Sequence, residues 1–116
     1  MKNRSVKSLS RFDREFKRLA KKYKSLTTEL IEFSTSLRAN PAQGKSLGAG
    51  LYKIRLANQS KGTGKRGGFR VVTYYVEQVG DEEVVYLVTI YDKSEEDNIR
   101  REELLDIVKD AFDDNN

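Results

Sequence analysis

The sequence predicts an α+β fold, in which a hairpin of two helices packs on a small, mostly antiparallel sheet of three to four strands, with a C-terminal helix. Three observations predict it. Apolar residues recur every three or four positions between residues 12 and 37, as in amphipathic helices. Between residues 51 and 91 they alternate with polar residues or run together with β-branched and aromatic ones, as in strands. The helical spacing returns between residues 104 and 112.

Two helices are expected near the start of the chain, after a short strand at residues 6–9. Ser10 followed three residues later by Asp13 is typical of a capping box, so the first helix is expected to begin at Ser10. The apolar stripes are Phe12, Phe16, Leu19, Ala20 and Tyr23, and then Leu26, Leu30, Phe33 and Leu37. The turn is expected at residues 24–27 with Ser25 or Thr27 as the second cap, and the second helix ends before Pro41.

Three strands are expected next, at residues 51–57, 69–76 and 84–91, after a glycine-containing loop at residues 41–50. Alternation in the first strand places Lys53 and Arg55 on the face opposite to Ile54. The third strand is almost continuously apolar, which predicts a central position in the sheet. Short connections between strands favour antiparallel pairing.

The last helix is expected to begin at Ser94, because Ser94 and Asp97 resemble a second capping box that opens an acidic first turn. Its buried stripe is Leu104, Leu105, Val108, Ala111 and Phe112. Residues 1–116 are expected to form a single domain, with fraying at 1–5 and 113–116.

Composition excludes several classes of chemistry. The chain has no Cys and no His, so it has no disulfide, no zinc site of the Cys/His type and no catalytic triad that needs His. No apolar run approaches the ~20 residues that span a bilayer, and the basic N-terminus lacks the apolar segment of a signal peptide. A cytoplasmic protein without a membrane partner is the expectation.

The charge is unevenly distributed along the chain. Residues 1–70 carry 18 Lys and Arg against 4 Asp and Glu, whereas residues 71–116 carry 4 against 14. A basic half of this kind favours a polyanionic partner such as nucleic acid. The alternative is a solvated surface whose two halves offset each other in the fold.

Residues 62–67 match the letters of a G-x-G-x-x-G nucleotide-binding loop, but their surroundings do not. A dinucleotide fingerprint needs a helix after the loop, and here a β-rich run follows. The segment is instead a basic loop next to basic strands. Six cations are expected on this one hairpin: Lys53, Arg55, Lys61, Lys65, Arg66 and Arg70. Such crowding is tolerated when the cations are solvated or when an anion such as phosphate lies among them.

These residues carry a resemblance to a known family. The stretches Asn40-Pro41, Gly44, Leu47-Gly48, 50–57, 61–71 and 86–95, and above all the string Lys61-Gly62-Thr63-Gly64-Lys65-Arg66-Gly67-Gly68-Phe69-Arg70, resemble the HigB branch of the RelE/ParE toxin superfamily. The resemblance implies a RelE-like fold and a toxin of a type II toxin-antitoxin module. It further implies a ribosome-dependent, metal-independent endoribonuclease that cuts messenger RNA and inhibits translation.

The resemblance also implies a site. By position, the catalytic residues would be Lys53, Arg55, Arg70, Tyr91 and Lys93. A guanidinium group can bind two phosphoryl oxygens at once, so Arg55 and Arg70 would stabilise the charge that develops on the phosphate. The proton acceptor is open among Lys53, Lys93 and Tyr91, since the chain lacks the tyrosine that RelE has on its last helix. RNA-binding residues would be Lys61, Lys65 and Arg66 of the loop, with Lys17 and Lys21 of the first helix as an anchor on ribosomal RNA.

The implied partners are a cognate antitoxin protein of the helix-turn-helix type, the ribosome and messenger RNA. No metal or other cofactor is implied, because a basic cluster repels a cation. Two alternatives remain from the sequence: a ParE-like toxin that acts on DNA gyrase without nuclease chemistry, and an RNA-binding module that does not cut.

Overall fold

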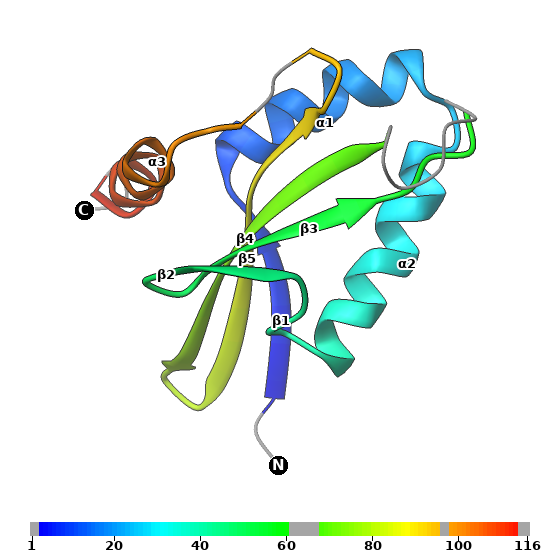
Figure 1. Cartoon of the computed structure of the whole chain (residues 1–116). Helices are drawn as coiled ribbons and strands as arrows, with labels where there is room; N and C mark the ends of the chain where they lie inside the picture. The colour runs from blue at the N-terminus through cyan, green and yellow to red at the C-terminus, as the bar shows by residue number, and fades with distance from the viewer. Residues whose placement is uncertain (1–2, 61–67, 96–97, 114–116) are drawn as a thin grey trace.

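The computed structural model describes residues 3–60, 68–95 and 98–113 and has a five-stranded sheet with helices on both faces (Figure 1). The elements in chain order are β1 (Asn3–Ser8), α1 (Ser10–Lys22), α2 (Leu26–Ala39), β2 (Lys45–Gly48), β3 (Leu51–Leu56), β4 (Phe69–Val79), β5 (Glu82–Asp92) and α3 (Arg101–Asp113). The predicted α+β class, helical hairpin and C-terminal helix are confirmed. The prediction of three to four strands is wrong, because the sheet has a fifth strand, β2.

The sheet has the order β1-β5-β4-β3-β2. Strands β2 to β5 pair antiparallel, and β1 pairs parallel with β5, so the sheet is mixed. Strand β5 has a neighbour on each side, which confirms the central position predicted from its apolar sequence. Residues 3–5 were expected to fray, but they form the first half of β1 and pair with residues 82–84.

Each face of the sheet has its own apolar core. The α1–α2 hairpin covers one face, and α3 lies on the other (Figure 1). Alternate residues of β3 and β4 separate the two cores: Ile54 and Val71 face the hairpin, whereas Leu51 and Val72 face α3. This alternation decides where the remaining polar residues of β3 and β4 lie.

Strand β2 replaces part of the predicted loop at residues 41–50. It is a short edge strand without apolar alternation, and it forms because a tight turn folds it back on β3. The turn is Gly48-Ala49-Gly50, in which all three residues have positive φ. Gly44, just before β2, has a φ of +92° and lies so close to β3 that a Cβ atom there would come within 2.5 Å of the Lys53 carbonyl oxygen. Only glycine fits such an approach without a shift of the backbone.

The first helix begins at Ser10, as predicted, but the capping interactions and the start of the last helix differ from the prediction. In α1 the N-cap position is Leu9, and Asp13 accepts a hydrogen bond from Ser8 Oγ at 2.6 Å instead of pairing with Ser10. In α2 the N-cap position is Ser25, one of the two predicted candidates, but its side chain makes no capping hydrogen bond, and Thr27 lies inside the helix. The last helix begins at Arg101 rather than at Ser94, because Ser94 turns back and donates to Asp92 Oδ1 through both its N–H and its hydroxyl. Asp97 lies outside the described residues.

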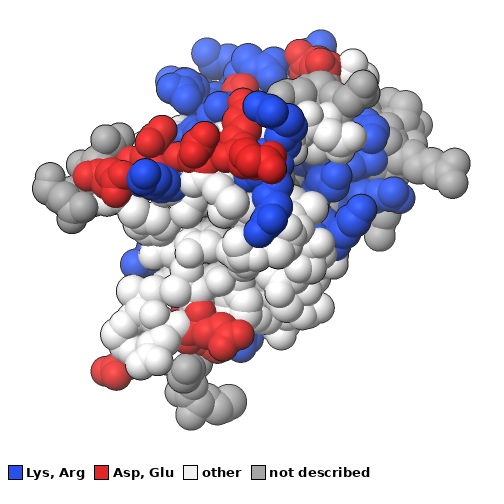
Figure 2. Space-filling model, turned by 60° about the vertical axis from the view of Figure 1, so that its left-hand side comes forward, with Lys and Arg blue, Asp and Glu red and all other residues white. Residues whose placement is uncertain are grey.

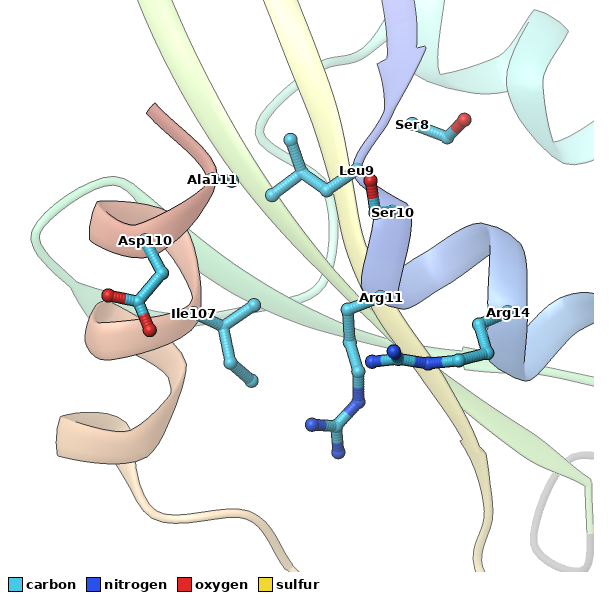
Figure 3. A pocket seen from close by; sticks show the side chains of 8 residues that line it. All are labelled: Ser8, Leu9, Ser10, Arg11, Arg14, Ile107, Asp110 and Ala111. Carbon is cyan, nitrogen blue, oxygen red and sulfur yellow. The ribbon is translucent and has the colours of Figure 1, made fainter. Parts of the chain in front are cut away.

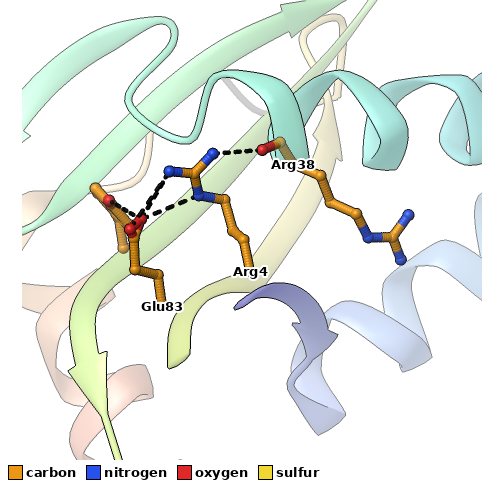
Figure 4. A network of polar contacts seen from close by, with 4 residues as sticks. Arg4, Arg38 and Glu83 are labelled. Carbon is orange, nitrogen blue, oxygen red and sulfur yellow. Dashed lines mark hydrogen bonds and ion pairs between the residues drawn. The ribbon is translucent and has the colours of Figure 1, made fainter. Parts of the chain in front are cut away.

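A polar network fastens β1 to the rest of the fold (Figure 4). The Arg4 guanidinium pairs with the Glu83 carboxylate at 2.7 Å and also donates to the carbonyl oxygen of Arg38 at the end of α2. Glu83 is only 8% exposed and accepts a further hydrogen bond from the Tyr75 hydroxyl at 2.9 Å. The network therefore joins β1, β4, β5 and α2.

Within the described ranges, no helix is long and apolar enough to cross a membrane.

Candidate active site

Three of the predicted catalytic residues form a row across the sheet. Arg55 on β3 is the register partner of Arg70 on β4, and Arg70 is the partner of Tyr91 on β5. Directly opposed residues of antiparallel strands project from the same face. The face is that of α3, because Tyr91 belongs to the apolar core beneath that helix.

Lys53 joins this row from the same strand face, two residues before Arg55. It is half-buried, and its Nζ atom donates a hydrogen bond to Asn98 Oδ1 at 3.0 Å. Burial lowers the pKa of Lys53 most, and positive charges lower it further. Those charges, in order of effect, belong to Lys45, Lys93, Arg70 and Arg55. We call Lys45, Lys53, Arg55, Arg70 and Lys93 the cationic cluster.

Lys45 is a member of the cluster that the sequence reasoning missed. It lies on β2 directly opposite Lys53. The signal was present in the sequence, since Lys45 and Lys53 are equally distant from Ala49 in the turn Gly48-Ala49-Gly50. Reading residues 41–50 as a loop hid this pairing.

The members of the row differ in access to solvent. Arg55 is exposed, whereas Arg70 is 5% exposed and its Nη1 atom donates to the Phe69 carbonyl oxygen at 3.4 Å. Tyr91 is 4% exposed and packs among Leu9 and other apolar side chains. A ligand on this face therefore meets Arg55 and Lys53 most directly.

A buried carboxylate that the sequence reasoning did not single out fixes the end of β5. Asp92 is fully enclosed, and it accepts hydrogen bonds from Ser94 and from the Tyr23 hydroxyl, the latter at 3.3 Å. The next residue is Lys93, whose N–H donates to the Gly68 carbonyl oxygen at 3.5 Å. Asp92 thus holds the strand end that carries Lys93.

A comparison with known protein families identifies the family of this chain. The family model described as the RelE toxin of the RelE/RelB toxin-antitoxin system matches residues 12–112, which include all five members of the cationic cluster. The chain belongs to the RelE toxin family. Toxins of this family act together with an antitoxin, so this RelE-family chain is the toxin member of such a pair.

In this RelE-family toxin, strand β3 ends at Leu56, next to Arg55 of the cationic cluster. Lys61, Lys65 and Arg66, predicted to bind RNA, lie outside the described residues. The chain before them is anchored to α2: Asn58 Nδ2 donates to Ser25 Oγ at 3.1 Å and also to the Glu29 carboxylate. The Gln59 N–H donates to Glu29 Oε2 at 2.9 Å.

The anchor predicts a stability effect. Asn58 is 2% exposed, and Asn58→Ala removes its donors from Ser25 and from a carboxylate. We expect the free energy of unfolding to fall by about 2 kcal/mol, because a buried hydrogen bond to a charged group is lost. Urea denaturation measures the change. Asn40→Ala, at an exposed position, should cost less than about 0.5 kcal/mol; equal losses in the two variants would contradict the anchoring role.

Lys17 and Lys21 lie apart from the cationic cluster. Both are exposed on α1, four residues apart and therefore on one side of the helix. Figure 2 shows basic side chains gathered at the upper end of the RelE toxin and a band of acidic side chains that crosses the view beside them. The exposed carboxylates of α3 are Glu102, Glu103, Asp106, Asp110 and Asp113.

The molecule also has a groove away from the predicted site. It has a volume of 550 Å³ and lies between the start of α1 and α3 (Figure 3). Arg11 and Arg14 reach into its mouth from α1, and Ile107 points inward from α3. None of the predicted catalytic residues lines it. In the described segments no three side chains of the metal-binding types lie close enough to hold an ion.

Proposed function

We propose that this RelE-family toxin belongs to the HigB branch and is a ribosome-dependent, metal-independent endoribonuclease that cuts messenger RNA and stops translation in the cytoplasm. The observation that carries the proposal is the cross-strand row of Arg55 and Arg70 with Lys53 beside it. A phosphate group between these side chains would offset their mutual repulsion. We further propose that the cognate antitoxin is of the helix-turn-helix type.

The cluster supports cleavage that uses the RNA's own 2′-hydroxyl. The 2′-oxygen forms a bond to the adjacent phosphorus, and the bond from phosphorus to the 5′-oxygen breaks. The 2′-hydroxyl gives its proton to a base, and the 5′-oxygen takes a proton from an acid. The products are a 2′,3′-cyclic phosphate and a 5′-hydroxyl. Two guanidinium groups on the phosphoryl oxygens would stabilise the charge that develops during this step.

Lys53 is the better supported proton acceptor. Its lowered pKa makes the neutral amine more accessible near neutral pH, and a base works only when it is unprotonated. Tyr91 is enclosed in the apolar core, which supports a role in shaping the site. We assign the proton donor for the leaving 5′-oxygen to Lys93, which follows the end of β5 and whose charge acts on Lys53.

The test compares a translated and an untranslated copy of one reporter RNA in bacteria that express the toxin under a tight promoter. We expect new 5′-hydroxyl ends in the translated copy only. Growth arrest without new ends would overturn the proposal in favour of a gyrase-directed toxin. If the experiment gives neither growth arrest nor new ends, the remaining interpretation is an RNA-binding module that does not cut.

The basic side of α1 gives a separate prediction about ribosome binding. Reversing two charges, in Lys17→Glu/Lys21→Glu, should weaken binding about 10-fold at low salt and reduce its salt dependence, because fewer counterions are released. Co-sedimentation with ribosomes at two salt concentrations measures both effects. Lys109→Glu on α3 is the control for a change in net charge. Unchanged affinity in the double variant would remove α1 from the interface.

A further inference from the structure

Residues 98–100, just before α3, lie at the face of the sheet that carries the cationic cluster. Ile99 and Asn98 contact the rest of the fold in different ways. Ile99 is buried in the same core as Leu104 of α3 and Leu51 of β3, so it holds the segment against the sheet. Asn98, the residue before it, is exposed and directs its side chain to Lys53.

The contact between Asn98 and Lys53 has a defined polarity. Lysine Nζ can only donate hydrogen bonds while it is charged, so the amide oxygen of Asn98 must be the atom that faces it, at 3.0 Å. The bond ties a long and otherwise adaptable side chain to a backbone segment that Ile99 anchors. Lys53 is therefore positioned from outside its own strand.

We propose that Asn98 is a positioning residue of the candidate active site: its amide oxygen holds the Lys53 nitrogen over the arginine row without adding a negative charge there. The catalytic consequence rests on the proposed RNA cleavage. The positioning itself rests on the contact between the two side chains and on the burial of Ile99.

The absence of charge on Asn98 matters because of what surrounds Lys53. It is faced by Lys45 from β2, Arg55 from its own strand, Arg70 from β4 and Lys93 from the end of β5. These groups, together with burial, favour the neutral amine. A carboxylate at position 98 would oppose their effect on the pKa of Lys53, because a negative charge at close range stabilises the ammonium form.

The substitution Asn98→Asp tests this inference with almost no change in side-chain size. We expect the pKa of Lys53 to rise by about 1, because an opposite charge within hydrogen-bonding distance favours the protonated form. The probe is protein labelled with ¹³C at the Cε atoms of lysine, and the Lys53 signal is assigned by its loss in Lys53→Arg. The control is Gln78→Glu, which makes the same amide-to-carboxylate change on an exposed residue near the opposite end of β4 from Arg70.

The activity of the same variants on ribosome-bound messenger RNA gives a second readout. A base must be unprotonated, so the rate falls as pH drops through the pKa of that base. In Asn98→Asp this acid-side fall should move to higher pH by the same amount as the pKa, while Gln78→Glu should follow the wild-type profile. A purely structural role for Asn98 would lower the rate equally at every pH.

The outcomes separate the two proposals. A Lys53 signal that titrates in Asn98→Asp as it does in the wild type would overturn the positioning role of Asn98. If the pKa of Lys53 rises in Asn98→Asp while the wild-type chain cuts no RNA, the Asn98 contact is supported and the nuclease proposal alone is overturned. Because position 98 is exposed, the thermal midpoint of Asn98→Asp should match the wild type, which checks that the variant is folded.

Discussion

Replacing Arg70 with alanine is expected to lower the rate of RNA cleavage by about 100-fold or more. Arg70 lies between Arg55 and Tyr91 in the cross-strand row, and it is buried, whereas Arg55 is exposed. A fixed donor aimed at developing charge contributes more to the transition state than a mobile one, and loss of one such donor costs roughly 100-fold to 1000-fold. Mapping of 5′ ends in the translated reporter, at matched toxin levels, measures the loss.

Two further variants make the result specific. Arg70→Lys keeps the charge but loses the paired donors of guanidinium, so it should restore only a small part of the activity. Arg38→Ala removes an equal charge at the exposed end of α2, where only the backbone carbonyl is used by Arg4, and it should cut at the wild-type rate. Full activity in Arg70→Ala would exclude Arg70 from the chemistry. Because Arg70 is buried, each variant is compared by its thermal midpoint as well.

Replacing Leu19 with alanine is expected to lower the free energy of unfolding by about 3 kcal/mol, because a large-to-small change in a packed core leaves a cavity as well as lost burial. Leu19 is completely buried where α1 packs on the sheet. Urea denaturation measures the change. Ile31→Ala removes a side chain that is 65% exposed on α2, and it should change stability by less than about 0.5 kcal/mol. Similar losses in both variants would contradict the assignment of the core.

Local patterns in the sequence were sufficient for most of the fold. The spacing of Phe12, Phe16 and Leu19 predicts α1, and the apolar run around Val88 predicts the central strand, because each pattern reports which side of one element is buried. Strand β2 could not be found in this way. It is stabilised by its pairing with β3 through the turn Gly48-Ala49-Gly50 and by the close approach of Gly44 to β3, not by a pattern within residues 45–48.

The candidate site was predicted in part for the same reason. Alternation along β3 places Lys53 and Arg55 on one face, but it does not predict which residues from other segments of the chain contact that face. Lys45 and Asn98 reach Lys53 only through strand pairing and the path of the chain after β5. The start of α3 was misplaced because Ser94 is a residue type typical of helix caps. In the structure, its N–H and hydroxyl donate to the nearby Asp92 carboxylate instead.

The parallel pairing of β1 with β5 has a consequence for how the chain folds. Arg4 and Glu83 are bonded across 79 residues of sequence, so the first strand has no strand to pair with until β5, at Glu82–Asp92, has been synthesised. Contacts between such distant residues slow folding, because the intervening chain must be ordered before they form. The arginine row depends on the same central strand through Tyr91. The nascent chain therefore completes its sheet and its cationic face together, late in synthesis.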